Sequence, residues 1–181
     1  MVKSELIKRS LLRIFEKSSH GGHGPGNIGM IVSPKGVGKT ACLVHIAADK
    51  LFQDKHVIHV SFSTRVDHII SWYEDIFREI AKKRELDSAV DIHDEIIKNR
   101  VIMNFNQDGI RTEQVVKSIK ALNRDGHFNA HTIIIDGFDL SQAELADIET
   151  IERFAAEEGI EVWFSVSTSE QQTDGNLPES L

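Results

Sequence analysis

The sequence predicts a three-layer α/β sandwich, with a mostly parallel central sheet between two layers of helices. Short apolar runs rich in β-branched residues alternate with longer segments whose apolar residues recur at helical spacing, which is the order typical of a parallel sheet. Several runs are apolar almost throughout, as expected of strands covered on both faces. The chain of 181 residues, 40% of them hydrophobic, is long enough for one substantial core, so a single compact domain is expected.

The first 19 residues, 1–19, are expected to form an amphipathic helix, because apolar residues between Leu6 and Phe15 recur at helical spacing. Residues 1–17 hold five basic and two acidic residues, a local charge of +3, whereas the whole chain carries −7. This asymmetry predicts that residues 3–17 contact a protein partner or a second copy of the chain. The alternative is that the apolar face of the helix packs on the protein's own sheet.

A flexible connector is expected over residues 20–27, because repeated glycine and a proline remove helix propensity. His20 and His23 in this connector could bind a metal. No cysteine or carboxylate stands beside them in the sequence, so a solvated loop is the favoured interpretation. Residues 28–181 are then expected to form the domain.

Strands and helices alternate along this domain. Strands are expected where short apolar runs occur, and helices where apolar residues recur every three or four positions. The expected strands cover residues 29–33, 57–62, 101–105, 131–138 and 160–167. The expected helices cover residues 39–51, 67–83 and 88–99, a segment that begins at the N-cap Thr112, and a segment from a capping box of Ser141 and Glu144 to a stop at Gly159.

The strongest motif is SPKGVGKT, residues 33–40, which matches the phosphate-binding pattern G-x-x-x-x-G-K-[ST] except that serine replaces the first glycine. Gly36 and Gly38 allow the backbone angles that turn amide groups toward phosphate oxygens, and Lys39 would reach the β- and γ-phosphates. A predicted strand precedes the motif and a predicted helix follows it, which favours nucleotide binding over a simple glycine-rich turn. The expected nucleotide-binding residues are Ser33, Pro34, Lys35, Gly36, Val37, Gly38, Lys39 and Thr40, and Lys39 is also expected to assist catalysis.

Thr40 and Asp136 are expected to hold Mg²⁺. The Thr40 hydroxyl would ligate the ion, and Asp136, at the end of the run TIIID, would hold it through its water shell. The alternative is that Asp136 caps a turn. Asp139, nearby in the sequence, is a weaker candidate for the same role. No N-K-x-D guanine signature occurs, which favours adenine by elimination, so the expected cofactors are ATP and Mg²⁺.

The motif SPKGVGKT, followed in order by VIHVSFS, IIIDGFD and VWFSVSTSEQ, resembles the RecA/KaiC-like P-loop ATPase superfamily over about residues 29–171. The resemblance implies a RecA-like P-loop NTPase sandwich in which another strand lies between the P-loop strand and the Asp136 strand. It also implies ATP, magnesium and frequent assembly into rings or filaments. Thr168, Ser169 and Gln171 resemble a position that senses the γ-phosphate, and the alternative is that they only form a turn.

Two departures from the family pattern predict weak or absent hydrolysis. The family places a glutamate, which polarises the attacking water, where Ser63 and Thr64 stand here. Asp67 could act as the general base from the next turn, although capping the following helix is the alternative role. Gly137 follows Asp136 where other ATPases carry a further glutamate. The family also continues with more strands after the last one seen here, so a clipped C-terminal edge is expected.

Composition further restricts the class of protein and its partners. The single cysteine, Cys42, excludes an internal disulfide and is expected in the core, while the charged N-terminus and the lack of a long apolar run predict a cytoplasmic protein without a membrane span. The net charge of −7 argues against nucleic acid as a partner. Trp72 and Tyr73 could stack on a base, but isoleucines at helical spacing around them favour core packing.

Three classes of function follow from these observations. The leading hypothesis is an ATP-binding protein with weak or absent hydrolysis. The second is a non-catalytic, nucleotide-sensing regulatory or scaffold protein, which the missing glutamates favour. The third is a small-molecule phosphotransferase, which Arg111 and Arg124 keep open although the sequence has no obvious arginine-rich lid.

Overall fold

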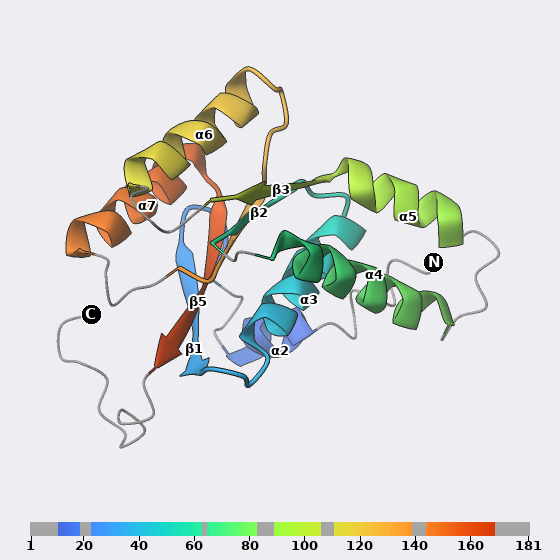
Figure 1. Ribbon diagram of the computed structural model, residues 1–181. Coiled ribbons are helices and arrows are strands. Elements are labelled where there is room, and N and C mark those ends of the chain that lie inside the picture. Colours follow the sequence, from blue (N-terminus) through green and yellow to red (C-terminus); the bar gives the residue numbers. More distant parts are fainter. Residues whose placement is uncertain are drawn as a thin grey trace.

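The computed structural model describes residues 11–18, 23–62, 65–82, 89–105, 111–138 and 144–168. These residues form an α/β fold of five strands and six helices (Figure 1). The strands are β1 (Ile28–Pro34), β2 (Val57–Ser61), β3 (Arg100–Asn104), β4 (Thr132–Asp136) and β5 (Glu161–Thr168). The helices are α2 (Leu11–Ser18), α3 (Lys39–Phe52), α4 (Val66–Lys82), α5 (Ala89–Lys98), α6 (Thr112–Arg124) and α7 (Leu145–Glu158).

The five strands form one parallel sheet in the order β1-β5-β4-β2-β3. Strand β5 therefore lies between β1 and β4, which is the neighbour relationship that the family resemblance implied. Because every pair is parallel, the carboxyl ends of all five strands meet at one edge of the sheet, which we call the carboxyl edge. The opposite edge, where the strands begin, is the amino edge.

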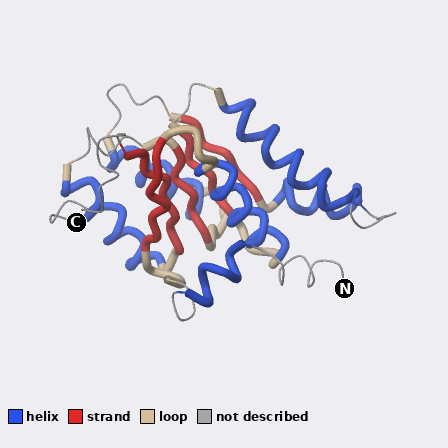
Figure 2. Tube along the Cα trace, turned by 90° about the horizontal axis from the view of Figure 1, so that it is seen from below, coloured by secondary structure: helices blue, strands red, loops and turns tan. Residues whose placement is uncertain are grey.

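Helices cover both faces of the sheet, as Figures 1 and 2 show. One hydrophobic cluster joins α2, α3 and α4 to one face, and a second joins α6 and α7 to the other. All five residues of β2 and all five of β4 are buried, as their continuous apolar runs predicted. The predicted α/β architecture with a parallel sheet is confirmed. None of the described helices is both long and apolar enough to cross a membrane.

Two predicted helix starts were wrong, one by one residue and the other by three. Thr112 is the first residue of α6, and Arg111 precedes it as the N-cap, whose backbone N–H donates to Gln114 Oε1. Glu144 is the N-cap of α7 and not its third residue, because its backbone N–H donates to the Asp147 carboxylate at 2.9 Å. Ser141, the predicted N-cap, lies outside the described residues. The predicted stop at Gly159 is confirmed, since Gly159 has a left-handed φ of 64°.

The two neighbouring aromatic residues of α4 have different environments. Tyr73 is 5% exposed, whereas Trp72 is 42% exposed, so the predicted core position of Trp72 was wrong. Successive residues of a helix point about 100° apart, so both rings cannot face the sheet. Ile69, Tyr73 and Ile76 occupy the buried stripe. Cys42 lies on α3 and packs against the core as predicted, and burial raises the pKa of its thiol.

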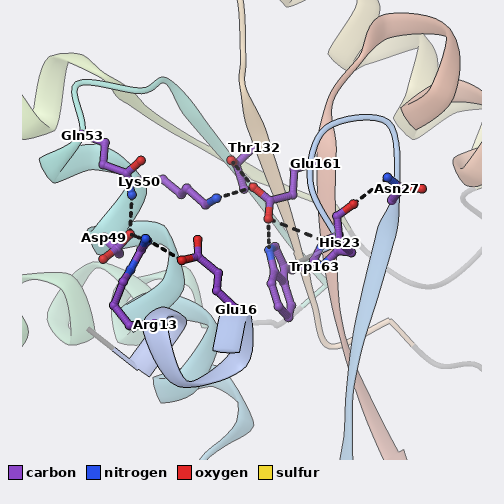
Figure 3. A network of polar contacts seen from close by, with 10 residues as sticks. All are labelled: Arg13, Glu16, His23, Asn27, Asp49, Lys50, Gln53, Thr132, Glu161 and Trp163. Carbon is purple, nitrogen blue, oxygen red and sulfur yellow. Dashed lines mark hydrogen bonds and ion pairs between the residues drawn. The ribbon is translucent and has the colours of Figure 1, made fainter. Parts of the chain in front are cut away.

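The described part of the N-terminal helix, α2, packs on the protein's own domain. Leu12 is 1% exposed and Phe15 packs against the same hydrophobic cluster. The guanidinium of Arg13 donates from Nη2 to Asp49 Oδ1 at 2.9 Å, and Asp49 lies on α3 with its side chain 1% exposed (Figure 3). Residues 11–18 therefore follow the alternative given above, in which the N-terminal helix packs on the protein itself and not on a partner.

A second set of polar contacts surrounds Glu161 at the amino edge of the sheet (Figure 3). Lys50 Nζ lies 2.5 Å from Glu161 Oε2, and both side chains are less than a tenth exposed. The indole Nε1 of Trp163 donates to Glu161 Oε1 at 3.2 Å. This buried ion pair joins the last turn of α3 to the start of β5 at the amino edge.

The connector residues 23–27 are also fixed to this edge. The His23 ring lies edge-on to Trp163, with ring centroids 4.2 Å apart, and the Asn27 amide donates from Nδ2 to the His23 carbonyl at 2.6 Å. A side chain at Gly29 would begin 2.5 Å from the His23 ring, so this close approach requires glycine. The prediction of a solvated loop was wrong for His23, whose pKa burial lowers, and His20 lies outside the described residues.

Candidate functional site at the carboxyl edge

The glycine-rich loop, residues 33–40, connects the end of β1 to the start of α3 at the carboxyl edge. Gly36 has a φ of 83° and Gly38 a φ of 95°, a region that side-chain-bearing residues rarely adopt. Nothing lies within 4 Å of a Cβ built at either glycine, so backbone angle and not lack of space requires glycine there. Gly38 is the N-cap of α3, so the positive end of this helix dipole faces the loop.

Lys39 folds its ammonium back over the loop. Its Nζ donates to the carbonyl oxygens of Ser33 at 2.8 Å and Pro34 at 2.6 Å. Partial desolvation lowers the pKa of Lys39, the Asp136 carboxylate opposes that shift, and Lys35 adds to it. The loop therefore concentrates one ammonium and the first amides of a helix at the same point, a combination that suits an anion.

Thr40 and Asp136 lie in direct contact. The Thr40 hydroxyl donates to Asp136 Oδ2 at 2.9 Å, which joins the first turn of α3 to the last residue of β4. Asp136 is 7% exposed, so its carboxylate faces the interior of the carboxyl edge and not bulk solvent. The two residues predicted to hold Mg²⁺ are thus brought together.

Ser165 is a member of this group that the sequence analysis missed. Its hydroxyl donates to Asp136 Oδ1 at 2.7 Å and accepts from the backbone N–H of Gly137 at 3.2 Å. Ser165 is 4% exposed and lies within the apolar run of β5. A polar residue in a buried run is a signal, but only the pairing of β4 with β5 shows that it faces Asp136.

A row of polar residues crosses the sheet at this level. Ser61 of β2 stands directly opposite Asp136 on one side and Asn104 of β3 on the other. Directly opposed residues of parallel strands point to the same face of a sheet. Together with Ser165, this row gives the carboxyl edge four adjacent polar side chains on the face that α3 covers.

His59 lies one step deeper on the same face, two residues before Ser61. Its side chain is fully buried, its Nδ1 hydrogen-bonds with Tyr73 Oη at 3.0 Å, and the Arg100 guanidinium lies 4.3 Å from the Tyr73 ring centroid. Burial lowers the pKa of His59 to about 4, with Asp136 opposing and Arg100 adding to the shift, so the ring is neutral at pH 7. Burial also raises the pKa of Tyr73.

The remaining predicted site residues are only partly described. Thr168 is the last residue of β5 and stands opposite Pro34 in the sheet register, beside the glycine-rich loop. Asp67 lies in the first turn of α4 with its side chain 70% exposed, and its Oδ2 lies 3.4 Å from Arg65 Nη2. Ser63, Thr64, Asp139, Ser169 and Gln171 lie outside the described residues.

The donor set at the carboxyl edge fits a phosphate and a hard cation. Lys39 and the start of α3 supply positive charge, while Thr40 and Asp136 supply the hydroxyl and carboxylate oxygens that Mg²⁺ prefers. Within the described ranges, no group of three or more His, Cys, Asp or Glu residues could hold a metal by itself. Mg²⁺ bound through a nucleotide uses one or two protein ligands together with phosphate oxygens and water.

A separate cleft of about 570 Å³ opens at the amino edge, at the opposite end of the strands from the glycine-rich loop. Its lining includes Lys50 and Glu161, whose charges pair with each other, and Arg124, whose Nη2 lies 3.6 Å from Glu158 Oε1. Lys50, Glu161 and Arg124 therefore make ion pairs within the protein, and the chemistry predicted from the sequence lies at the other edge.

No protein-family model matches the chain, and no curated protein matches it either.

Proposed function

We propose that the protein binds ATP with Mg²⁺ at the carboxyl edge, through residues 33–40 and Asp136. The contact between the Thr40 hydroxyl and the Asp136 carboxylate carries this proposal, because it joins the two oxygen groups beside Lys39 and the glycine-rich loop. Parallel α/β sheets bind ligands at the carboxyl ends of their strands, which is where this contact lies.

The residues would divide the work as follows. The loop amides and the start of α3 would bind phosphate oxygens. The Lys39 ammonium would give up its hydrogen bonds to the Ser33 and Pro34 carbonyls and bind phosphate oxygens instead. Thr40 and Asp136 would hold Mg²⁺, which neutralises phosphate charge when bound. Asp136 would act through the water shell of the ion.

We further propose that the domain is a divergent member of the RecA/KaiC-like superfamily. Two observations support this: the position of β5 between β1 and β4, and the order of the motifs along the chain. On this proposal hydrolysis is slow or absent, because Ser63 and Thr64 replace the glutamate that the family uses to polarise water. A nucleotide-sensing regulatory protein would use the same site and differ only in turnover.

Calorimetric titration with ATP in the presence of Mg²⁺ tests the proposal. The wild type should bind, and Lys39→Ala should weaken binding roughly 10- to 100-fold, since a hydrogen-bonded charge on phosphate contributes about 1.5–3 kcal/mol. Lys117→Ala is the matched control, because Lys117 is an exposed lysine of α6 and lies outside the loop. Equal loss in both variants, or no loss in either, would show that the loop is not the nucleotide site.

A further inference from the structure

We propose that Ser165 is a positioning residue that fixes the orientation of the Asp136 carboxylate toward the metal. This inference rests on the proposed function, because it concerns the same Mg²⁺-nucleotide site. Ser165 belongs to β5, whereas the two residues expected to hold the ion belong to α3 and β4.

The hydrogen bonds of Ser165 define its role. A serine hydroxyl has one proton to donate, and here that proton goes to Asp136 Oδ1 at 2.7 Å. The backbone N–H of Gly137 donates to the same hydroxyl at 3.2 Å, which favours the rotamer that faces Asp136. Both side chains are less than a tenth exposed, so water competes little for this bond.

The two oxygens of Asp136 consequently have different partners. Oδ1 accepts from Ser165 within the sheet, and Oδ2 accepts from Thr40 at the start of α3. Rotation of the carboxylate about its last side-chain bond would break both hydrogen bonds together. Ser165 therefore keeps Oδ2 directed at Thr40, where the ion would be held, and leaves Oδ1 out of that site.

A purely structural role for Ser165 predicts a different result from a positioning role. If the hydroxyl only satisfies a buried carboxylate, its removal lowers the stability of the domain and affects nucleotide binding equally with and without metal. If it orients Asp136 for the ion, its removal reduces the gain in affinity that Mg²⁺ gives and leaves metal-free binding intact, because the loop and Lys39 do not touch Ser165 in the described contacts.

The experiment measures ATP affinity by calorimetry with saturating Mg²⁺ and with excess EDTA. For Ser165→Ala, the gain in affinity on adding Mg²⁺ should fall roughly tenfold, a typical effect of losing a hydrogen bond to a charged group. Affinity in EDTA should stay within about twofold of the wild type, which also reports that the variant is folded. Ser165→Thr retains the hydroxyl and should restore the gain. Ser118→Ala, which removes a hydroxyl bonded to the Gln114 carbonyl on α6, is the control.

The outcomes separate this inference from the proposed function. A wild type that does not bind ATP overturns the proposed function. A wild type that binds ATP more tightly with Mg²⁺, with the same gain in Ser165→Ala, overturns the positioning role alone. Equal weakening of Ser165→Ala in Mg²⁺ and in EDTA also overturns it, in favour of a structural role.

Discussion

The hydroxyl of Thr40 lies 2.9 Å from the carboxylate of Asp136, although 96 residues separate them in the sequence. The contact joins the helix that follows the glycine-rich loop to a central strand of the sheet. Asp136 is 7% exposed, so each donor it loses leaves a carboxylate that water cannot readily solvate. The same contact should therefore contribute to stability before any ligand binds.

We expect Thr40→Val to lower the free energy of unfolding by about 1–2 kcal/mol, because a buried carboxylate loses one of its donors. Thr40→Ser retains the hydroxyl and should lose less than half as much. Urea unfolding followed by circular dichroism measures both. Equal midpoints for Thr40→Val and the wild type would mean that the contact with Asp136 contributes nothing to the unliganded protein.

Replacement of Ser33, the one departure from the phosphate-loop pattern, should be tolerated. Its side-chain oxygen is buried without a hydrogen-bond partner among the described residues, while its carbonyl, which any residue would supply, accepts from Lys39. Ser33→Gly removes the unsatisfied hydroxyl and adds a glycine cost of about 0.5–1 kcal/mol, so stability should change little. ATP should bind at least as tightly as in the wild type.

Ser33→Ala separates the two effects in that prediction. It removes the hydroxyl without the backbone cost of glycine, so it should raise the thermal midpoint above that of Ser33→Gly. A collapse in stability in both variants would reveal a structural hydrogen bond of Ser33.

Arg13 should contribute strongly to stability if α2 is an integral part of the domain. Removing its guanidinium leaves the Asp49 carboxylate, which is 1% exposed, without its ionic partner. Breaking such a buried pair costs about 3–5 kcal/mol, and the partial exposure of Arg13 places Arg13→Ala at the low end of that range. Urea unfolding gives the value.

Arg78→Ala is the matched control, because the pair of Arg78 with Asp75 is mostly exposed and should contribute less than about 1 kcal/mol. Deletion of residues 1–19 should then destabilise the domain further. Unchanged stability after the deletion, with altered oligomerisation, would instead support the predicted partner contact of the N-terminal helix.

The order and type of the secondary-structure elements could be predicted from the sequence because their apolar periodicities are clear. The pair Thr40 and Asp136 could also be predicted, because a motif and a strand end mark them. Ser165 could not, because its role depends on which strand lies beside β4. His23 was misjudged for a similar reason: a glycine-rich composition says nothing of the Trp163 ring against which it packs.

The buried ring of His59 should make the protein less stable in mild acid. Burial lowers its pKa from 6.5 to about 4, so between these values the unfolded chain binds a proton that the folded protein does not. The free energy of unfolding therefore falls as the pH decreases from 6.5 to about 4, by about 3 kcal/mol in total. Urea unfolding at several pH values measures the slope.

His59→Leu, which cannot titrate, should flatten this part of the profile. His23 and His131 also have lowered pKa values and act in the same direction, so a smaller slope should persist. An unchanged slope in His59→Leu would show that His59 is not the group responsible.

Hydrolysis of ATP should be slow even if the protein binds ATP with high affinity. A carboxylate that polarises the attacking water contributes about 10²- to 10⁴-fold to the rate, and neither Ser63 nor Thr64 can replace it. Asp67 is the nearest acidic residue in the sequence, but its side chain is 70% exposed and lies beside Arg65. An exposed carboxylate in the first turn of a helix is well placed to interact with the helix dipole, which explains its presence without catalysis.

Single-turnover assays with Mg²⁺-ATP should therefore give rates far below those of a relative that has the glutamate. Thr64→Glu should raise the rate if this position is the only defect. If Asp67 does serve as the base, Asp67→Asn should abolish the residual turnover and leave ATP affinity nearly unchanged. Rapid turnover by the wild type that survives Asp67→Asn would contradict both the weak-hydrolysis prediction and the substitute role of Asp67.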